Sequence, residues 1–574
     1  MRQKEKWTVT AKRADFAGIG KRFGIDQVIA RIIRNRDVIT EEEIEEYLNG
    51  DIESLPDSAL LKDVEKAAEI LADKIEKKKR IRIIGDYDID GVESSYILWE
   101  GMERLGGKVE VVIPDRIKDG YGVNEHLIEL AIEEGVDTIL TCDNGIAAAD
   151  ALKKAKDAGL SVIVTDHHEI PFGEEDGKKI EILPKADAIV NPKQSDCPYP
   201  YKELCGAAVA WHFMRVLYKT MGRDVHETDE FIENAAFATV GDVMDLRFEN
   251  RILVKEGLKR LNRTTNIGMR SLIQTKNLEL GSIKAYHIGF VLGPCLNASG
   301  RLDTARKALL LLKTKDERKA MQLAEELAEL NEERKTMTEQ GIEDAVSDIE
   351  KRGLQKDKVL VSYLADCHES IAGIIAGRIR ERYHRPVYIL TNGEDCVKGS
   401  GRSIENYSMY EELCKCEDLL EKFGGHPMAA GCSMRAENVE AFRERLNRET
   451  SLTEEELIPK IKIDVPMPLD YLREDLIEQL NLLEPFGKGN EKPVFADRNL
   501  RIHSQRVVGK NQNVVRMKIV TESGNSFTGV YFGDVQEFMS FLEKKKEGIS
   551  IVYYPQINSY FENIQIEVVV SAYC

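Results

Sequence analysis

The chain alternates between two apolar patterns from about residue 62 to residue 240. Short runs rich in Ile, Val and Leu have the length of buried strands and lie at 80–85, 109–114, 137–142 and 160–165. Segments with helical periodicity separate these runs, at 62–79, 91–106, 125–135 and 148–158. Strands that alternate with helices predict βαβ units and a parallel sheet. In such sheets, ligands bind outside the carboxyl ends of the strands.

The later part of the chain changes pattern twice. Residues 316–352 are nearly continuous helix formers, which predicts one long helix between two domains; a coiled-coil seam is disfavoured because no heptad is sustained. A second α/β segment rich in glycine motifs follows, and from about 459 short strands with turn signals predict a small β-barrel. We therefore divide the chain into an N-terminal segment (1–59), an α/β domain (60–315), the connecting helix (316–352), a second α/β domain (353–455) and the barrel (456–574).

The composition excludes several classes of protein. Hydrophobic residues make up 42% of the 574 residues and charged residues 32%, which excludes a disordered or collagen-like chain. No apolar run approaches about 18 residues, and no apolar core follows the charged N-terminus, so we expect neither a membrane span nor a signal peptide. None of the ten cysteines forms a CxxC pair, which favours a reduced cytoplasmic protein over a zinc ribbon or a redox motif.

The formal net charge of -19 bears on the possible binding partners. It argues against a protein that binds nucleic acid through a wholly basic domain. A local basic groove is still compatible with this sum, and a cluster of metal-binding aspartates would itself contribute negative charge.

The first buried run is followed at once by three carboxylates, Asp86, Asp88 and Asp90. Acidic side chains at this spacing repel one another unless a cation binds between them. Two other interpretations are open for this motif alone. One is a calcium loop of the EF-hand type, in which Ile97 stands where a glutamate is required, and the other is a solvated acidic turn.

The next two buried runs also end in side chains that ligate metals. Asp143 follows the run at 137–142, and the Asp-His-His triplet at 166–168 follows the run at 160–165. Because neighbouring strands lie about 4.8 Å apart, these groups can converge on one crevice. The coincidence at three strands favours a shared site over three separate turn residues.

A fourth acid, Asp242, follows another apolar run; alone it would be assigned as a helix cap, and Asp245 competes with it for any role. The full set combines carboxylates with imidazoles and contains no thiolate, which disfavours structural zinc and favours Mn²⁺ or Mg²⁺. Two such ions about 3.5–4 Å apart would activate water for in-line attack on phosphorus. The residues alone therefore indicate metal-assisted hydrolysis of a phosphoester.

These motifs resemble those of known families. DYDIDG (86–91), Asp143-Asn144-Gly145, Asp166-His167-His168 and the GDV step around Asp242 resemble the four motifs of the DHH phosphoesterase superfamily. Five further segments resemble motifs of the RecJ family of bacterial single-strand exonucleases: GPCLNASGRL (293–302), CHESIAGIIAGR (367–378), GSGRS (399–403), FGGHPMAAG (423–431) and LEPFGKGN (483–490). The resemblance runs from about residue 60 to the C-terminus, in the order DHH domain, connecting helix, DHH-associated domain and OB-fold.

The resemblance implies 5′→3′ release of 5′-mononucleotides from single-stranded DNA in recombination and repair, with two Mn²⁺ or Mg²⁺ ions as cofactors. It assigns Asp143 as the bridging ligand and places Asp166 behind a histidine, whose tautomer it fixes. The metal ligands that it implies are Asp86, Asp88, Asp90, Asp143, His167, His168 and Asp242, and Asp166 completes the catalytic set. Which histidine binds metal and which faces the phosphate stays open.

The resemblance also implies a pocket for the 5′ end of the DNA. Ser400, Arg402 and Arg116 are candidates to hold the terminal phosphate, because a guanidinium fork and a hydroxyl make charge-assisted, bidentate contacts with such a group. This pocket would explain the polarity, since an internal phosphate would bring its upstream nucleotide into a clash.

Other candidates lie along the expected path of the strand. Asn297 and Arg301 are expected beside it, and the glycines around His426 suggest a close approach of backbone and DNA, with tight packing as the alternative. Tyr121 is a candidate to stack a base, with an ordinary turn residue as the alternative. The barrel also contains four basic residues that could either line a strand-binding groove or simply be solvated surface residues, with equal weight: Arg506, Lys510, Arg516 and Lys518.

Two other functions are kept as alternatives. A DHH phosphodiesterase for short oligonucleotides or cyclic dinucleotides is disfavoured by the barrel, since a dinucleotide needs no extended path. A non-catalytic replication scaffold is disfavoured by the intact acidic set. We expect a cytoplasmic monomer whose partners are single-stranded DNA with a 5′ end and, as suppliers of such ends, a single-strand-binding protein and a helicase.

Overall fold

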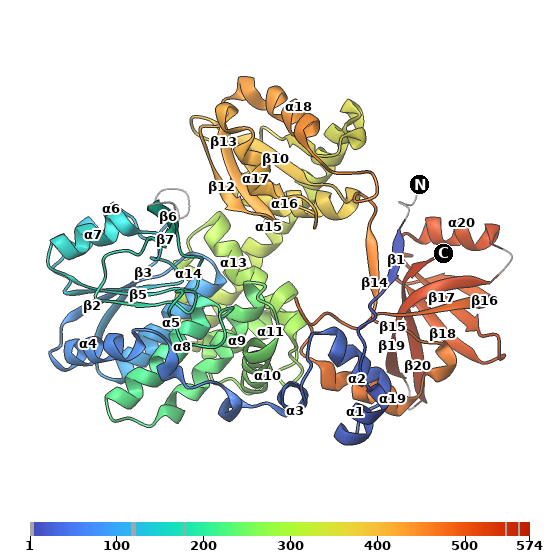
Figure 1. Ribbon diagram of the computed structural model, residues 1–574, viewed down its shortest axis with the longest axis horizontal. Coiled ribbons are helices and arrows are strands. Elements are labelled where there is room, and N and C mark those ends of the chain that lie inside the picture. The colour runs from blue at the N-terminus through green and yellow to red at the C-terminus, as the bar shows by residue number, and fades with distance from the viewer. Residues whose placement is uncertain (1–4, 116–121, 176–177, 546–547, 561–562) are drawn as a thin grey trace. The chain divides into compact units, whose positions relative to one another are not determined.

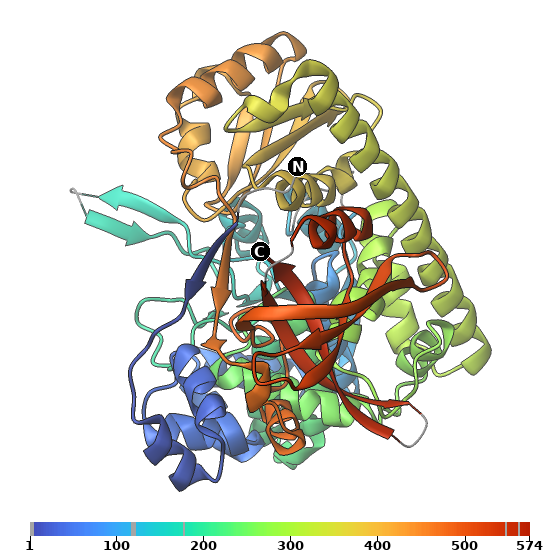
Figure 2. The same cartoon turned by 90° about the vertical axis from the view of Figure 1, so that its right-hand side faces the viewer.

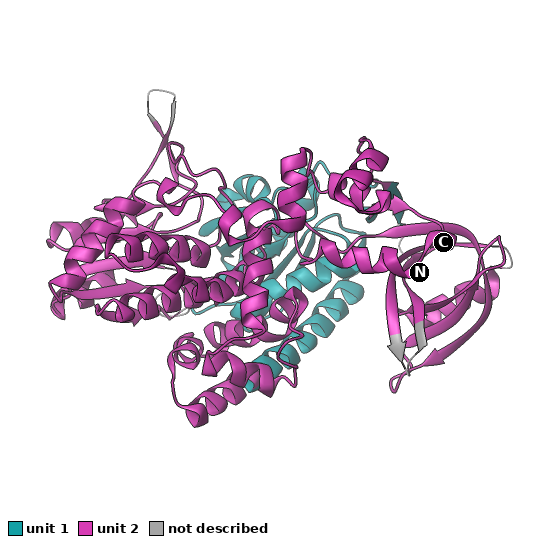
Figure 3. Ribbon diagram, turned by 90° about the horizontal axis from the view of Figure 1, so that it is seen from below, with its two compact units in different colours: residues 1–8, 329–461 teal, residues 9–328, 462–574 magenta. Residues whose placement is uncertain are grey.

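The computed structural model describes residues 5–115, 122–175, 178–545, 548–560 and 563–574. It divides into two compact units, of which unit 1 holds residues 1–8 and 329–461 and unit 2 holds residues 9–328 and 462–574 (Figure 3). The long helix predicted at 316–352 is α15 (Glu317–Arg352), which continues from unit 2 into unit 1. Among the described residues, no helix is both long and apolar enough to cross a membrane.

The first α/β domain has the parallel sheet that the sequence predicts (Figure 1). Its strands are β2 (Arg80–Ile84), β3 (Lys108–Val112), β4 (Thr138–Cys142), β5 (Ser161–Thr165) and β8 (Ala188–Val190). They lie side by side in the order β3-β2-β4-β5-β8, and every pair is parallel. The chain goes from β2 to β3 on one side and then returns to form β4 on the other side of β2. This reversal opens a crevice at the carboxyl ends of β2 and β4.

Helices alternate with these strands as the periodicity predicts. One, α4 (Val64–Glu76), precedes β2, and the others follow a strand: α5 (Ile89–Arg104), α6 (Glu125–Glu133) and α7 (Ala149–Asp157). A further helix, α8 (Gly206–Thr220), packs tightly against α5. A Cβ at Gly101 of α5 would lie 2.5 Å from the Cε of Met214, and the Tyr218 hydroxyl donates to the Gly101 carbonyl over 3.1 Å. The glycine therefore permits the close approach of the two helices.

A hairpin that the sequence analysis did not assign follows the Asp-His-His triplet. Its strands, β6 (Phe172–Glu175) and β7 (Lys178–Glu181), pair with each other and form a sheet of their own (Figure 2). Gly173 lies beneath Ile182, since a Cβ there would be 3.1 Å from the Cδ1 of that residue. The hairpin connects β5 to β8 within the same domain.

Unit 1 contains the second α/β fold. Its sheet has the order β12-β13-β11-β10-β9, in which β9 and β10 are parallel and the other pairs antiparallel. The strands are β9 (Leu360–Tyr363), β10 (Val387–Asn392), β11 (Val397–Arg402), β12 (Lys422–His426) and β13 (Ala429–Met434). Helix α16 (Glu369–Tyr383) packs against β10 and β11.

The C-terminal segment forms the predicted barrel. Its strands are β16 (Phe495–Val508), β17 (Val514–Val520), β18 (Ser526–Tyr531), β19 (Ile549–Tyr560) and β20 (Asn563–Tyr573). The order β16-β17-β18-β20-β19 closes because β19 pairs again with β16. Closure leaves no free sheet edge among these strands, which is the architecture of an OB-fold.

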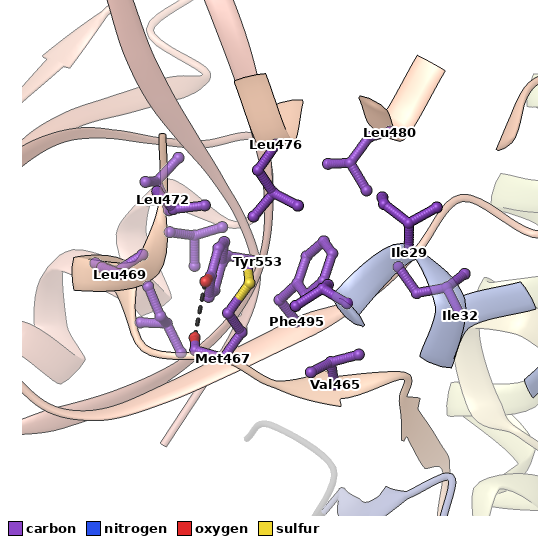
Figure 4. Packing of buried hydrophobic residues seen from close by; sticks show 14 of the residues in the cluster. Ile29, Ile32, Val465, Met467, Leu469, Leu472, Leu476, Leu480, Phe495 and Tyr553 are labelled. Carbon is purple, nitrogen blue, oxygen red and sulfur yellow. Dashed lines mark hydrogen bonds between the residues drawn. The ribbon is translucent and has the colours of Figure 1, made fainter. Parts of the chain in front are cut away.

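The N-terminal segment shares a hydrophobic core with the residues around the barrel. Its helices are α1 (Phe16–Phe23), α2 (Gln27–Asn35) and α3 (Glu41–Asn49). Ile29 and Ile32 of α2 point toward Leu480 and Phe495, and all four are buried (Figure 4). From residue 9 onward, the segment is therefore part of unit 2 rather than an appendage.

Candidate metal centre

Three neighbouring strands of the parallel sheet deliver acidic or imidazole side chains at their carboxyl ends. Asp86 follows β2, Asp143 follows β4, and His167 follows β5. Because β4 lies between β2 and β5, the side chains meet at one edge of the sheet. Three groups of candidate ligand atoms each lie within 4.8 Å of one another: Asp86, Asp88 and Asp143; Asp90, His167 and Asp242; and Asp143, His167 and His168.

The acidic turn after β2 is held by its own backbone. The Oδ1 of Asp88 accepts hydrogen bonds from the N–H groups of Asp90 (3.0 Å) and Gly91 (3.1 Å), so Asp88 is the N-cap of α5. A Cβ at Gly91 would lie 2.4 Å from the Asp86 carbonyl oxygen. Only glycine allows the helix to start this close to Asp86, and this closeness keeps the carboxylates together.

Asp90 is fixed by a second helix. Its two carboxylate oxygens accept the backbone N–H groups of Gly206 (2.6 Å) and Ala207 (2.7 Å), which open α8. The positive end of the α8 dipole therefore faces an aspartate that is 1% exposed. These two hydrogen bonds fix the side chain of Asp90.

Asp143 has a strained backbone. Its φ is +58°, a left-handed conformation that is uncommon for a residue with a side chain. A Cβ at Gly206 would lie 2.7 Å from the Cβ of Asp143, so the first residue of α8 must be small. Strain of this kind gathers at functional sites, where the surrounding structure imposes it.

The two histidines differ in burial and in partners. The Nε2 of His167 lies 3.0 Å from the Oδ1 of Asp143 and 3.5 Å from the Oδ2 of Asp90, and its side chain is 8% exposed. Its buried Nδ1 has no hydrogen-bond partner within the part of the chain that the structure describes. His168 is 40% exposed, and its Nδ1 lies 2.8 Å from the Oδ1 of Asp166.

Burial and mutual repulsion shift the pKa values of the acids. Burial, with the charges of Asp90 and Asp88, raises the pKa of Asp143 well above its ordinary value. The same causes raise the pKa of Asp242 to about 8. Burial and the neighbouring Asp90 also raise the pKa of Asp88. The cluster therefore has an excess of negative charge that protons or cations must offset.

The histidine pKa values shift in opposite directions. Burial lowers the pKa of His167, so this imidazole is neutral near pH 7. Burial also acts to lower the pKa of His168, but the hydrogen bond and the charge of Asp166 raise it to about 9. Burial acts to raise the pKa of Asp166, but the hydrogen bond and charge of His168, with the charge of His167 and the Ile146 N–H, together hold that pKa below its ordinary value.

The helix that carries the GPCLNASGRL motif, α13 (Gly293–Leu302), lies against the acidic turn. The Oδ1 of Asn297 accepts a hydrogen bond from the Ile89 N–H over 2.9 Å. A Cβ at Gly300 would lie 2.1 Å from the Tyr87 carbonyl oxygen, so the helix touches the turn directly. Arg301, half-buried, comes next on the same helix.

Three other predicted site residues belong to unit 1. Ser400 and Arg402 lie on β11, and His426 ends β12. Arg402 and His426 are both in register with Ala429 of β13, so the two side chains share one face of the sheet. A Cβ at Gly373 of α16 would lie 2.7 Å from the Nη2 of Arg402, which places the guanidinium over this helix. His426 is exposed.

Comparisons with known proteins match each part of the chain. Residues 80–239 match the model of the DHH family, N-terminal domain, residues 356–451 match the DHHA1 domain, and residues 463–572 match the RecJ OB domain. The single-stranded-DNA-specific exonuclease RecJ of Bacillus subtilis is 35% identical over 93% of this chain and 67% of that protein. The protein of the same name from Escherichia coli is 33% identical over 86% of each chain.

The chain belongs to the RecJ family. Among solved structures, RecJ from Thermus thermophilus in complex with Mn²⁺ superposes with a TM-score of 0.82, at 27% identity, over 99% of this chain and 79% of that one. The same protein in complex with Mg²⁺ gives a TM-score of 0.77. Family and fold class are thus as the motifs indicated.

The donor set of this RecJ-family chain fits hard divalent ions. Carboxylates with one neutral imidazole are the ligands that suit Mn²⁺ and Mg²⁺. The raised pKa values of Asp143 and Asp242 show carboxylates that crowd one another, which a cation between them relieves. The unpartnered Nδ1 of His167 shows that this ring is not locked by a second hydrogen bond in the part of the chain that is described.

Two predicted residues, Arg116 and Tyr121, lie outside the described residues. Conversely, sequence reasoning missed Gly206 and Ala207, whose backbone N–H groups hold Asp90. It also missed Ile146, whose N–H donates to the Oδ2 of Asp166 over 2.9 Å. Backbone donors leave no signal in residue type, although the small residues at the start of α8 are compatible with a close approach.

Proposed function

We propose that this protein is a metal-dependent exonuclease that degrades single-stranded DNA from the 5′ end and releases 5′-mononucleotides. The observation that carries the proposal is the convergence of the Asp86, Asp143 and His167 ligand atoms at three adjacent strand ends, in a chain of the RecJ family. We also propose that the protein acts in DNA recombination and repair, as its resemblance to this family implies.

The proposed metal ligands are Asp86, Asp88, Asp90, Asp143, His167 and Asp242. When bound, two Mn²⁺ or Mg²⁺ ions supply a Lewis acid that activates water and offsets charge on the scissile phosphate. Asp143 is the proposed shared ligand, because its oxygens lie within 4.8 Å of the ligand atoms of Asp86 and Asp88 and also of both histidines. Its left-handed backbone conformation supports a functional role for this residue.

His167 is the proposed metal ligand of the histidine pair. A metal ligand must be a neutral imidazole, and the lowered pKa of His167 and its place beside Asp143 and Asp90 meet this need. His168 is instead held as a half-exposed cation by Asp166. In this position its Nε2–H would donate a hydrogen bond to the phosphate, while Asp166 accepts from Nδ1 and holds the ring in place.

The 5′ phosphate is assigned to Ser400 and Arg402, with Arg116 as a further candidate. The Arg402 side chain is half-buried, and it shares one face of the sheet with Ser400 and with Gly424 and Gly431, which add no side chains there. A planar guanidinium binds a terminal phosphate by two parallel hydrogen bonds. His426 on the same face, and Tyr121, are proposed contacts to the nucleotide.

Along the strand, Arg301 is the proposed phosphate contact on α13. The Oδ1 of Asn297 has a structural role, because it accepts a hydrogen bond from the Ile89 N–H. The amide nitrogen of Asn297 is the group that we propose contacts DNA. The barrel adds a groove of about 660 Å³, lined in part by Arg506, Arg516 and Lys518 with Phe527. Cations beside a partly buried aromatic ring suit a single strand, and Lys510 is not among the lining residues.

The alternatives are less well supported. A phosphodiesterase for dinucleotides gives no task to the barrel groove. A non-catalytic scaffold gives no reason for the crowded carboxylates of the cluster, whose desolvation is costly.

We also propose a monomer in the cytoplasm, with single-strand-binding protein and a helicase as the partners that supply 5′ ends. The ten cysteines support a reducing compartment, since all are free and most are buried.

The deciding experiment digests single-stranded and duplex DNA that carry a label at one end, in Mn²⁺, Mg²⁺ or chelator. With either metal, we expect the 5′ label to leave first, as a mononucleotide, and only from single-stranded DNA. With chelator, we expect no release from either substrate. Early release of the 3′ label, or equal digestion of duplex, would refute the proposal.

A further inference from the structure

Two aromatic side chains, Tyr286 and Phe290, are exposed side by side outside the metal centre. Tyr286 belongs to α12 (Ala285–His287) and Phe290 to the π-helical turn η4 (Ile288–Leu292). Their ring centroids lie 5.0 Å apart with 27° between the planes, and the residues are 62% and 65% exposed. Large rings stacked in water expose apolar surface that a folded chain normally buries, which marks a binding surface. π-helical turns also occur often at functional sites.

The turn that carries the pair packs against the helix that leads to Asp242. Ile288 is buried on the inner side of the turn, and a Cβ at Gly289 would lie 3.7 Å from the Cγ1 of Val240 in α9 (Ile232–Gly241). Asp242 is the C-cap of that helix. The exposed rings therefore flank the helix end that presents Asp242 to the cluster.

Ile89 packs against both the end of α9 and the start of α13, the helix that follows the turn. A Cβ at Gly241 would lie 2.5 Å from the Cδ1 of Ile89, and a Cβ at Gly293, the first residue of α13, would lie 3.0 Å from the same atom. Ile89 is the first residue of α5, next to Asp88 and Asp90. The turn that bears the rings is thus packed on the acidic turn as well as on α9.

Two exposed lysines lie on adjoining segments: Lys284 comes two residues before Tyr286, and Lys488 pairs with Asp245, three residues after Asp242. The Nζ of Lys284 lies 2.9 Å from the Oε1 of Glu484, and the Nζ of Lys488 lies 3.1 Å from the Oδ1 of Asp245. Both lysine side chains are about 60% exposed, and such surface ion pairs are weak enough for a phosphate to replace the carboxylate. Lys488 is fixed by its backbone, since its carbonyl accepts the Leu246 N–H over 2.7 Å.

We propose that Tyr286 and Phe290 form a stacking platform for bases of the single strand beside the metal centre, and that Lys284 and Lys488 bind the adjoining phosphates. The inference rests on the proposed function and deepens it, because it assigns contacts to nucleotides beyond the one that is released. The occupant is a single-stranded nucleic acid because apolar rings between cations complement bases between phosphates. A paired base keeps its face covered by its neighbours in the duplex and cannot use the platform.

The test compares a variant that lacks the two aromatic rings with a variant that keeps them. The ring-free protein is Y286L/F290L, which keeps an apolar surface, and the ring-retaining protein is Y286F/F290Y. Binding of a 5′-phosphorylated oligothymidylate of about 12 nucleotides, labelled at its 3′ end, is measured by fluorescence anisotropy in chelator, where no cleavage occurs. We expect the Kd of the ring-free protein to rise about tenfold, and that of the ring-retaining protein to stay within about twofold of wild type.

A second readout reports stacking itself. An oligonucleotide with 2-aminopurine should show quenched fluorescence on the wild type and on the ring-retaining protein, with the quenching relieved on the ring-free protein. Leu310→Ala, a substitution at an exposed apolar residue of α14 (Arg306–Lys313), serves as control and should bind as wild type does. Lys488→Gln should weaken binding by a smaller factor that disappears at high salt.

The outcomes separate the two proposals. If wild type degrades single-stranded DNA but the ring-free protein binds and quenches as wild type does, the platform is refuted and the exonuclease assignment stands. If wild type with Mn²⁺ fails to degrade single-stranded DNA, the proposed function itself is refuted. Equal weakening by Leu310→Ala would also overturn the platform, because the effect would then not depend on rings.

Discussion

Asp166 and His168 form an ion pair in which the histidine Nδ1 lies 2.8 Å from the aspartate Oδ1. The carboxylate is fully buried, and its second oxygen is fixed by the backbone N–H of Ile146. The imidazole ring is 40% exposed. A buried carboxylate thus holds a half-exposed imidazole, the group that we propose contacts the phosphate.

Asp166→Asn should lower exonuclease activity by about 10–100-fold, as loss of a partner behind a metal-site histidine does. The neutral amide no longer raises the pKa of His168, so His168 loses its proton at a lower pH. As the pH is raised, we therefore expect activity to fall at a lower pH than in the wild type. The pH profile of kcat/KM measures both effects. Asp187→Asn is a suitable control, because Asp187 also accepts a backbone N–H, that of Val162 over 2.7 Å, away from the site. An unchanged profile in Asp166→Asn would remove this aspartate from the site.

The stability of the metal-free protein should fall as the pH rises from about 4 to 8. Asp242 has a folded-state pKa of about 8 against an ordinary value of 3.8, so the folded state binds its proton more tightly than the unfolded state does. The contribution to stability is complete below the ordinary pKa and is lost as the pH rises through the folded pKa. The raised pKa of His168, about 9, acts in the same direction.

Mn²⁺ should reverse this trend, because it takes the place of the protons in the cluster. The Mn²⁺-induced rise in the unfolding midpoint, followed by thermal denaturation, should be larger at pH 8 than at pH 6. A rise of equal size at both pH values would show that the ion binds elsewhere.

The strands of the metal centre were predictable because each is a short apolar run between helical segments. β2 and β4 are buried almost throughout, and the residue types that follow them carry the chemistry. The assignment of the two histidines was not predictable. It depends on the burial of His167 against Asp90, and Asp90 is fixed by the start of α8, more than 100 residues away in the chain.

Long-range contacts also explain what was missed elsewhere. Ile29 and Ile32 pack with residues beyond position 460, so no local pattern could show their partner. β16 is mostly exposed and lacks clear alternation; it is a strand because it pairs with β17 and β19. The sequence showed which residues are apolar, while the neighbours of those residues depend on the tertiary structure.

Arg402→Ala should chiefly remove the preference for 5′-phosphorylated ends. Loss of the guanidinium removes charge-assisted contacts to a dianionic terminal phosphate, whereas a 5′-hydroxyl end makes no such contacts. The ratio of kcat/KM for the two ends measures the effect, and we expect a fall of about tenfold or more. Arg378→Ala on α16, where the side chain is 58% exposed, is the control. An unchanged ratio in Arg402→Ala would exclude this residue from the 5′ pocket.

Arg251 joins the N-terminal segment to the rest of unit 2. This residue is 2% exposed, its Cζ lies 3.8 Å from the centroid of the Tyr47 ring, and it donates to the carbonyls of Tyr47, Leu482 and Leu483. Arg251→Met should cost about 3 kcal/mol of stability, since three buried carbonyls lose a charged donor. Urea denaturation measures this, with Arg263→Met, a substitution at an exposed residue, as control. A loss below about 0.5 kcal/mol would contradict the role of Arg251.

The proposed metal centre depends on Asp143 as the ligand that the two metal positions share. The most direct test is Mn²⁺-dependent release of mononucleotides from single-stranded DNA by wild type and Asp143→Ala, with circular dichroism to show that both are folded. We predict that the variant is folded and that its rate falls to the level seen with chelator. Full activity in folded Asp143→Ala would contradict the proposed metal centre.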